Sequence, residues 1–82
     1  MINYNGRPLV KTFTGIIGSI PNYYTWAIFT NSGGASGTID FGYGNIYTLD
    51  SGEQIMIPTG GKAYETTVID ATATTIKVLY QN

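Results

Sequence analysis

The sequence contains neither cysteine nor histidine. Without cysteine, the chain can form no disulfide bond and no thiolate metal site. Without histidine, it lacks the commonest general base and the commonest metal ligand. A Ser-His-Asp or a Cys-His mechanism is therefore impossible, and we expect a protein that is not an enzyme and holds no cofactor or metal.

Charged residues are scarce as well. Four Lys or Arg and five Asp or Glu make up 11% of the chain and give a net charge of −1, whereas an average protein is about one quarter charged. There is no basic run to neutralise phosphates, which argues against a nucleic-acid partner. Few charges together with 13% aromatic residues are typical of protein interfaces. We therefore expect other protein to cover part of this surface.

Long hydrophobic runs are absent too. No apolar run approaches the length of a transmembrane helix. The segment Met1–Asn5 has neither the basic nor the apolar region of a classical secretion signal. We expect a protein of the cell interior with no membrane anchor. A turn signal at Asn5-Gly6, followed by Pro8, predicts an N-terminal arm over residues 1–8, ahead of a single domain over residues 9–82.

The sequence does contain a regular succession of short segments with the composition of β-strands. Each is rich in β-branched or aromatic residues and is closed by Gly, Asn, Asp or Pro, and no helical periodicity is present. This pattern predicts an all-β fold, a single small antiparallel β-sandwich of about seven strands. The expected strands lie at Leu9–Phe13, Tyr23–Thr30, 37–42, Asn45–Leu49, 51–58, Tyr64–Ile69 and Thr74–Tyr80.

The segments between these strands are predicted as bends and turns. Gly15–Pro21 is expected to form a bend or bulge that places Ile16, Ile17 and Ile20 in the core. Asn31–Gly37 is polar and glycine-rich, and we expect it to be the most mobile loop. In the last strand, alternation points Ile76, Val78 and Tyr80 inward, with Lys77 and Leu79 on the outer side.

One stretch carries a resemblance to a known group of proteins. It reads Tyr47-Thr48-Leu49-Asp50-Ser51-Gly52-Glu53-Gln54-Ile55-Met56-Ile57-Pro58 and is accompanied by Phe29-Thr30-Asn31, Gly37-Thr38-Ile39, Val68-Ile69-Asp70-Ala71-Thr72 and Thr75-Ile76-Lys77-Val78. Over residues 29–80 the chain resembles small β-sandwich structural proteins of tailed-bacteriophage virions. The shared feature is a T-L-x-x-G-E-x-I-x-I-P hairpin followed by a final strand pair. Gly52 suits a tight turn with positive φ, and Pro58 ends strand pairing because it lacks an N–H.

The resemblance implies a non-enzymatic virion protein, assembled in the bacterial host cytoplasm. Foremost is a capsid decoration or auxiliary protein that packs on the shell and reinforces it, and the alternative is a tail, baseplate or fibre-attachment subunit. The expected partners are other virion proteins, first the major capsid protein, and further copies of the chain as a homo-oligomer, with neither nucleic acid nor membrane. The candidate interface residues are Tyr4, Tyr23, Tyr24, Trp26 and Phe29.

Two readings from other classes remain open. A carbohydrate-binding module would use exposed aromatic rings to stack on sugars, and the candidates are Tyr23, Tyr24, Trp26, Tyr43, Tyr47 and Tyr64. A glycosidase or a Ca²⁺ site would need convergent carboxylates. The available carboxylates are Asp40, Asp50, Glu53, Glu65 and Asp70. Four of these lie at strand ends or beside turns, which the ordinary preference of such residues for turns explains. We assign no catalytic, cofactor-binding or metal residue.

Overall fold

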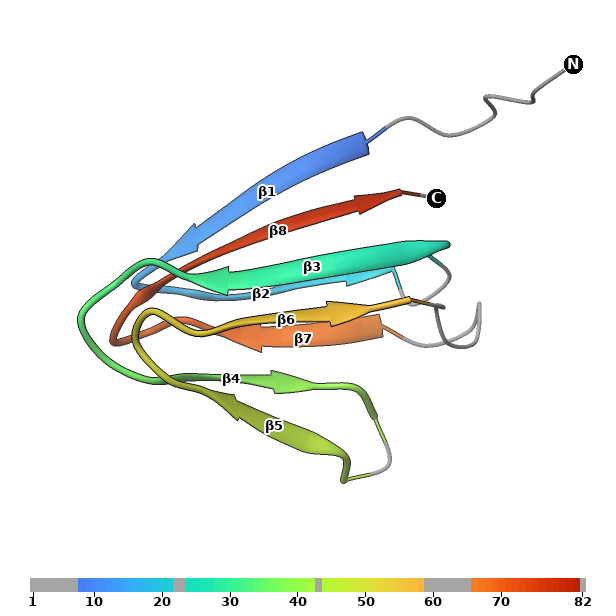
Figure 1. Ribbon diagram of the computed structural model, residues 1–82. Helices are drawn as coiled ribbons and strands as arrows, with labels where there is room; N and C mark the ends of the chain where they lie inside the picture. Colours follow the sequence, from blue (N-terminus) through green and yellow to red (C-terminus); the bar gives the residue numbers. More distant parts are fainter. Residues whose placement is uncertain (1–7, 22–23, 43, 59–65, 82) are drawn as a thin grey trace, which may run out of the picture.

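The computed structural model describes residues 8–21, 24–42, 44–58 and 66–81 of the 82-residue chain. These residues form eight strands and no helix, which confirms the all-β prediction (Figure 1). The strands are β1 (Pro8–Thr14), β2 (Ile17–Pro21), β3 (Trp26–Asn31), β4 (Gly37–Asp40), β5 (Ile46–Leu49), β6 (Gln54–Ile57), β7 (Thr66–Asp70) and β8 (Thr75–Gln81).

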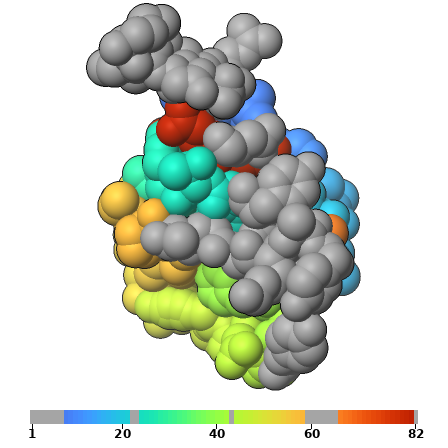
Figure 2. All heavy atoms as spheres, turned by 90° about the vertical axis from the view of Figure 1, so that its right-hand side faces the viewer, coloured from blue at the N-terminus to red at the C-terminus, as the bar shows by residue number. Residues whose placement is uncertain are grey.

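The strands form two four-stranded antiparallel sheets. The first sheet has the order β1-β8-β3-β6 and the second has the order β2-β7-β4-β5. Successive strands lie in opposite sheets, except β4 and β5, which pair with each other. This is the strand order of a jelly roll, an eight-stranded form of the antiparallel sandwich. Figure 2 views the molecule along its strands, with β3 and β6 toward the left and β2 toward the right.

The predicted hairpin over residues 47–58 is wrong. Its turn has the expected form, with Gly52 at a φ of 82° and the Glu53 N–H donating to the Asp50 carbonyl over 2.9 Å. However, β5 pairs with β4 and β6 pairs with β3, so the turn carries the chain from one sheet to the other. The expected final strand pair is likewise divided, because β7 and β8 lie in different sheets. A strand–turn–strand pattern does not reveal whether its two strands pair with each other.

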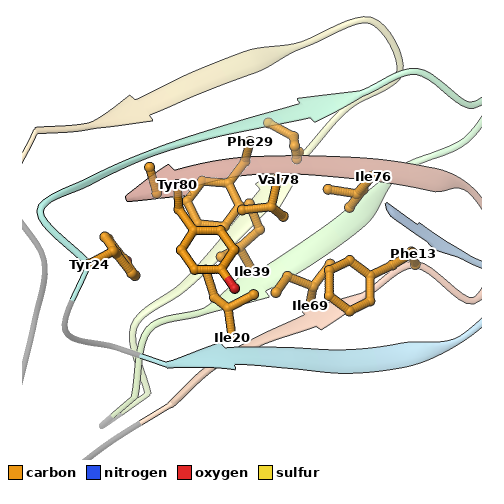
Figure 3. Packing of buried hydrophobic residues seen from close by; sticks show 12 residues of the cluster. Phe13, Ile20, Tyr24, Phe29, Ile39, Ile69, Ile76, Val78 and Tyr80 are labelled. Atoms are coloured by element: carbon orange, nitrogen blue, oxygen red, sulfur yellow. The ribbon is translucent and has the colours of Figure 1, made fainter. Parts of the chain in front are cut away.

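The core lies between the two sheets, where alternate side chains of every strand meet (Figure 3). Ile76, Val78 and Tyr80 point inward as predicted, and Phe29 meets Phe41 edge to face with 5.9 Å between ring centroids. Within the described ranges, the buried apolar residues are Phe13, Ile20, Tyr24, Ala27, Phe29, Ile39, Leu49, Ile69, Ala71, Ile76, Val78 and Tyr80.

The segment predicted as a bend or bulge contains strand β2 instead. A sharp turn at Gly15, with a φ of 68°, carries the chain from β1 into this strand. Ile20 is buried as expected, but Ile16 and Ile17 are exposed. The alternation of the strand explains the difference at Ile17, because Gly18 and Ile20 share the inward side and Ile17 takes the other.

Asn31 organises the end of the sandwich where four crossover turns meet. Its side-chain Nδ2 donates to the carbonyls of Ala35 and Leu49, each over 2.8 Å. Its Oδ1 accepts from the Gly33 N–H at 3.0 Å and from the Thr74 hydroxyl at 2.7 Å. Sequence reasoning placed Asn31 at the start of a mobile loop, whereas the structure buries it completely at the end of β3.

Candidate functional site

The outer face of the first sheet carries a continuous row of apolar side chains. The register sets Val10 of β1 opposite Leu79 of β8, Leu79 opposite Ile28 of β3, and Ile28 opposite Met56 of β6. Directly opposite residues in a sheet project to the same side, so these four side chains cross the whole sheet. With strands about 4.8 Å apart, the row spans roughly 14 Å between its outermost backbones. We call it the apolar row.

The two ends of the apolar row are open to solvent. Val10 is 66% exposed and Met56 is 61% exposed, while Ile28 and Leu79 between them are half-buried. The end residues lie on the edge strands β1 and β6, where only one neighbouring strand covers them. Contiguous apolar patches often mark surfaces that bind another molecule, whereas exposed apolar residues that are scattered singly are normal.

Polar groups border the apolar row on one side, and a tryptophan borders it on the other. Trp26 lies two residues before Ile28 on β3 and is half-buried, with its indole Nε1–H donating to Gln81 Oε1 over 2.7 Å. On the opposite side lies a polar row whose members are Thr12, Lys77, Thr30 and Gln54. Among the described residues on this face, Lys77 is the only charged one. The face thus has an apolar half next to Trp26 and a polar half with one positive charge.

The outer face of the second sheet lacks such continuity. Its two most exposed apolar residues, Ile17 at 60% and Ile46 at 59%, lie on opposite edge strands. Asp70, Thr38 and other polar side chains separate them in the register. Apolar residues dispersed in this way are normal on soluble proteins. We therefore take the outer face of the first sheet as the candidate functional site.

The interface residues predicted from sequence divide into three groups. Phe29 is fully buried and Tyr24 nearly so, which places both in the core. Of the candidates that the structure describes, Trp26 is the one that reaches the outer face of the first sheet. Tyr4 and Tyr23 lie outside the described residues. Burial raises the pKa of Tyr24, while its hydroxyl contact with Thr67 at 3.4 Å acts in the opposite direction.

The apolar row itself was not predicted. Its four members are separated along the chain and meet only through strand register, which no local pattern encodes. The available signals were the outward position of Leu79 and the largely apolar composition of both sides of the segment 23–30.

The described carboxylates accept hydrogen bonds from residues in or beside turns. Asp40 accepts from the Gly42 N–H at 2.8 Å, and Asp70 accepts from the Thr72 N–H and hydroxyl. Asp50 accepts from the Ser36 hydroxyl. Among these residues no group of three or more metal-ligating side chains forms. Glu65 lies outside the described residues.

Glu53 makes the most extensive of these contacts. One of its oxygens accepts from the Asp50 N–H at 2.9 Å and the other from the Tyr47 hydroxyl at 2.8 Å. The Asp50 N–H, and after it the Tyr47 hydroxyl, lowers the pKa of the Glu53 carboxyl. The hydrogen bond between Tyr47 and Glu53 also raises the pKa of the Tyr47 hydroxyl. This pair ties β5 to the turn that follows it.

A shallow open depression of about 340 Å³ lies at the crossover end of the sandwich. Its walls are formed by small residues and threonines, among them Thr14, Gly33, Gly34, Thr72 and Thr75. No charged or aromatic side chain lines it, so it lacks the convergent polar and apolar groups of a typical ligand site.

No protein-family model, curated protein or solved structure matches this chain. Within the residues that the structure describes, no helix has the length and apolar character needed to cross a bilayer.

Proposed function

We propose that this protein is a non-enzymatic structural component of a tailed-bacteriophage virion, a capsid decoration or auxiliary protein that packs on the shell. The apolar row on the first sheet is the observation that carries the proposal. This surface is formed by Val10, Leu79, Ile28 and Met56. Its aliphatic side chains and methionine suit burial against another protein rather than a catalytic role. The phage assignment itself rests on the sequence resemblance over residues 29–80.

The fold is compatible with this role but does not select it. Jelly rolls serve as viral capsid domains and also as lectin domains, and one fold hosts many functions. The binding of sugars by stacking needs exposed aromatic rings. Of the aromatic residues that the structure describes, Trp26, Phe41 and Tyr47 are half-buried and the others are buried. The described surface therefore favours a protein-binding role over a carbohydrate-binding one.

The mechanism of such a protein is adhesive. Each copy covers its apolar row with a neighbouring subunit, and the repeated array makes weak single contacts sufficient. The small size of the apolar row argues for such a repeated array. The four side chains of the apolar row are far fewer than the roughly 20–30 residues per partner of a standard stable interface, so one isolated contact through this row would be weak.

The first test measures the mass of the purified protein by light scattering over a range of concentrations. Because a single contact through this face is weak, we expect the wild type to form trimers or larger assemblies at the higher concentrations and to dissociate on dilution. A Val10→Lys/Met56→Lys variant should remain smaller, because it places two charges at the exposed ends of the apolar row. The matched control is Ile17→Lys/Ile46→Lys, which changes two residues of similar exposure on the other sheet and should assemble as the wild type does. A wild type that stays monomeric throughout would contradict assembly of the chain with itself.

The virion assignment needs a second experiment. An antibody against the protein is applied to particles of the phage that encodes it, and the particles are viewed by electron microscopy. Labelling in a repeated array over the head is the expected result. Labelling at the tail would favour the baseplate or fibre alternative, and intact particles without label would rule out both.

A further inference from the structure

Strand β1 offers the longest free edge among the described strands. Each sheet has two edge strands, β1 and β6 in the first sheet and β2 and β5 in the second. Strands β5 and β6 have four residues each, and β2 has five and ends at Pro21. Strand β1 has seven residues, with proline only at its first position. Figure 1 shows β1 at the outside of the molecule, beside β8 alone.

An edge of this kind can accept a further strand. Alternate backbone N–H and C=O groups of an edge strand point away from its sheet and pair readily with another extended chain. Only Phe13 in β1 is buried, and Leu9 is half-buried. The remaining residues of β1 are exposed, so most of this edge is accessible in the part of the chain that the structure describes.

Lys11 lies at the centre of this edge. It is opposite Val78, whose side chain points into the core, so Lys11 lies on the inward side of the sheet between Leu9 and Phe13. Its side chain is exposed, and the structure shows no ion pair or hydrogen bond of Lys11 with any described residue. A charge on the inward side of an edge strand hinders indiscriminate edge-to-edge pairing.

Lys11 selects among the strands that could pair with β1. When two copies of β1 pair antiparallel with all seven residues in register, Lys11 meets Lys11 of the second copy, and like charges directly opposite each other are destabilising. A one-residue shift would turn every side chain to the wrong face, and a two-residue shift, which keeps the faces matched, would leave only five of the seven residues of β1 paired. A strand with a carboxylate at this position instead forms a favourable pair across the edge.

We propose that the β1 edge is a strand-accepting site for an extended segment of a partner protein that carries Asp or Glu opposite Lys11. The residues next to this Asp or Glu lie on the outer face of the sheet, beside Val10. Apolar side chains at that position would extend the apolar row. The site lies on the sheet edge rather than on its face, and the inference holds whether or not the protein belongs to a virion.

A charge-exchange experiment tests the proposal with β1 itself as the probe strand. The Lys11→Glu variant presents the same edge with the opposite charge. Wild type alone and variant alone each oppose like charges, whereas a mixture pairs a lysine with a carboxylate. We expect the mixture to associate roughly tenfold more tightly than either protein alone, with a higher mass in sedimentation and new hydrogen-exchange protection confined to β1. Added salt should weaken this association.

Two controls separate the edge from the sheet face. Lys77→Glu makes the same charge change on the central strand β8, and its mixture with the wild type should not gain mass. The main experiment is then repeated with Met56→Lys in both proteins, which leaves β1 intact and disables the far end of the apolar row. Association that persists in the presence of Met56→Lys takes place at the β1 edge rather than on the sheet face. A Lys11→Glu mixture that associates no more than its components, or no more than the Lys77→Glu mixture, overturns the proposal.

Discussion

The ring of Phe13 in β1 occupies the space in which residue 18 of β2 would carry a β-carbon. A β-carbon at Gly18 would lie 2.5 Å from Phe13 Cδ2 and closer still to Cε2. The two residues belong to opposite sheets. The absence of a side chain at Gly18 therefore lets Phe13 close the corner where β1 turns into β2.

Gly18→Ala should destabilise the protein by about 1–3 kcal/mol, because the added methyl group forces Phe13 out of its position. The midpoint of urea unfolding measures the loss. Gly34→Ala is the matched control, since a β-carbon there meets nothing within 4 Å, and its midpoint should stay near that of the wild type. Equal losses in the two variants would show that Phe13 and Gly18 are not tightly packed.

Asn31→Ala should be among the most destabilising single changes, at about 3 kcal/mol or more, because it leaves several buried polar groups without partners. The carbonyl of Leu49 and the hydroxyl of Thr74 are two of these groups. Thermal unfolding followed by circular dichroism gives the comparison. The control is Asn45→Ala, whose Nδ2 donates to the Gly42 carbonyl in an exposed turn, and which should cost about 0.5 kcal/mol. Similar losses would contradict the central role of Asn31.

The fold class could be predicted because one side of most strands is strongly apolar. Ile76, Val78 and Tyr80 alternate with less buried residues, and this period of two identifies both the strand and its inward face. The turn at Gly52 was predictable for a similar local reason, since glycine adopts positive φ at little cost. These inferences need only residues that are neighbours in sequence.

The pairing of strands could not be predicted in the same way. Whether β5 pairs with β6 depends on contacts with β3, in particular the bonds from Gly52 N–H to the Asn31 carbonyl and from Asn31 N–H to the Glu53 carbonyl, both 2.9 Å. A polar residue such as Asn31 has the same local signature in a mobile loop as in a buried hub. Only the assembled sandwich distinguishes the two.

The candidate surface was missed for a related reason. Aromatic type indicates both core and interface residues, so it grouped Phe29 and Tyr24, which are buried, with Trp26, which is not. The apolar row consists instead of aliphatic residues and a methionine, brought together by the register of four strands.

The contact between Tyr47 and Glu53 should make stability depend on pH. The pKa of Glu53 is lowered in the folded protein, so its contribution is present above the unfolded value of about 4.3 and is lost as the pH falls through the folded value. The pKa of Tyr47 is raised, so its contribution is present below about 10 and is lost as the pH rises through the folded value.

Glu53→Gln isolates this effect because it removes the charge and keeps the shape. At neutral pH the variant should melt at a lower temperature than the wild type, and the two melting temperatures should converge in acid once Glu53 is protonated. Calorimetric scans across the acid range provide the measurement. A gap that stays constant with pH would mean that the ionised carboxylate adds nothing to stability.

Trp26 should report on whether the outer face of the first sheet is covered. It is the only tryptophan of the chain, it is half-buried beside the apolar row, and its indole N–H is held by Gln81. Covering the row removes water from the indole ring, which shifts its emission to shorter wavelength. We expect this blue shift to develop over the same concentrations at which the mass in solution rises. Met56→Lys should suppress both changes together, whereas Ile46→Lys, at nearly equal exposure on the other sheet, should suppress neither. A rise in mass without any shift in Trp26 emission would place the contact elsewhere on the protein.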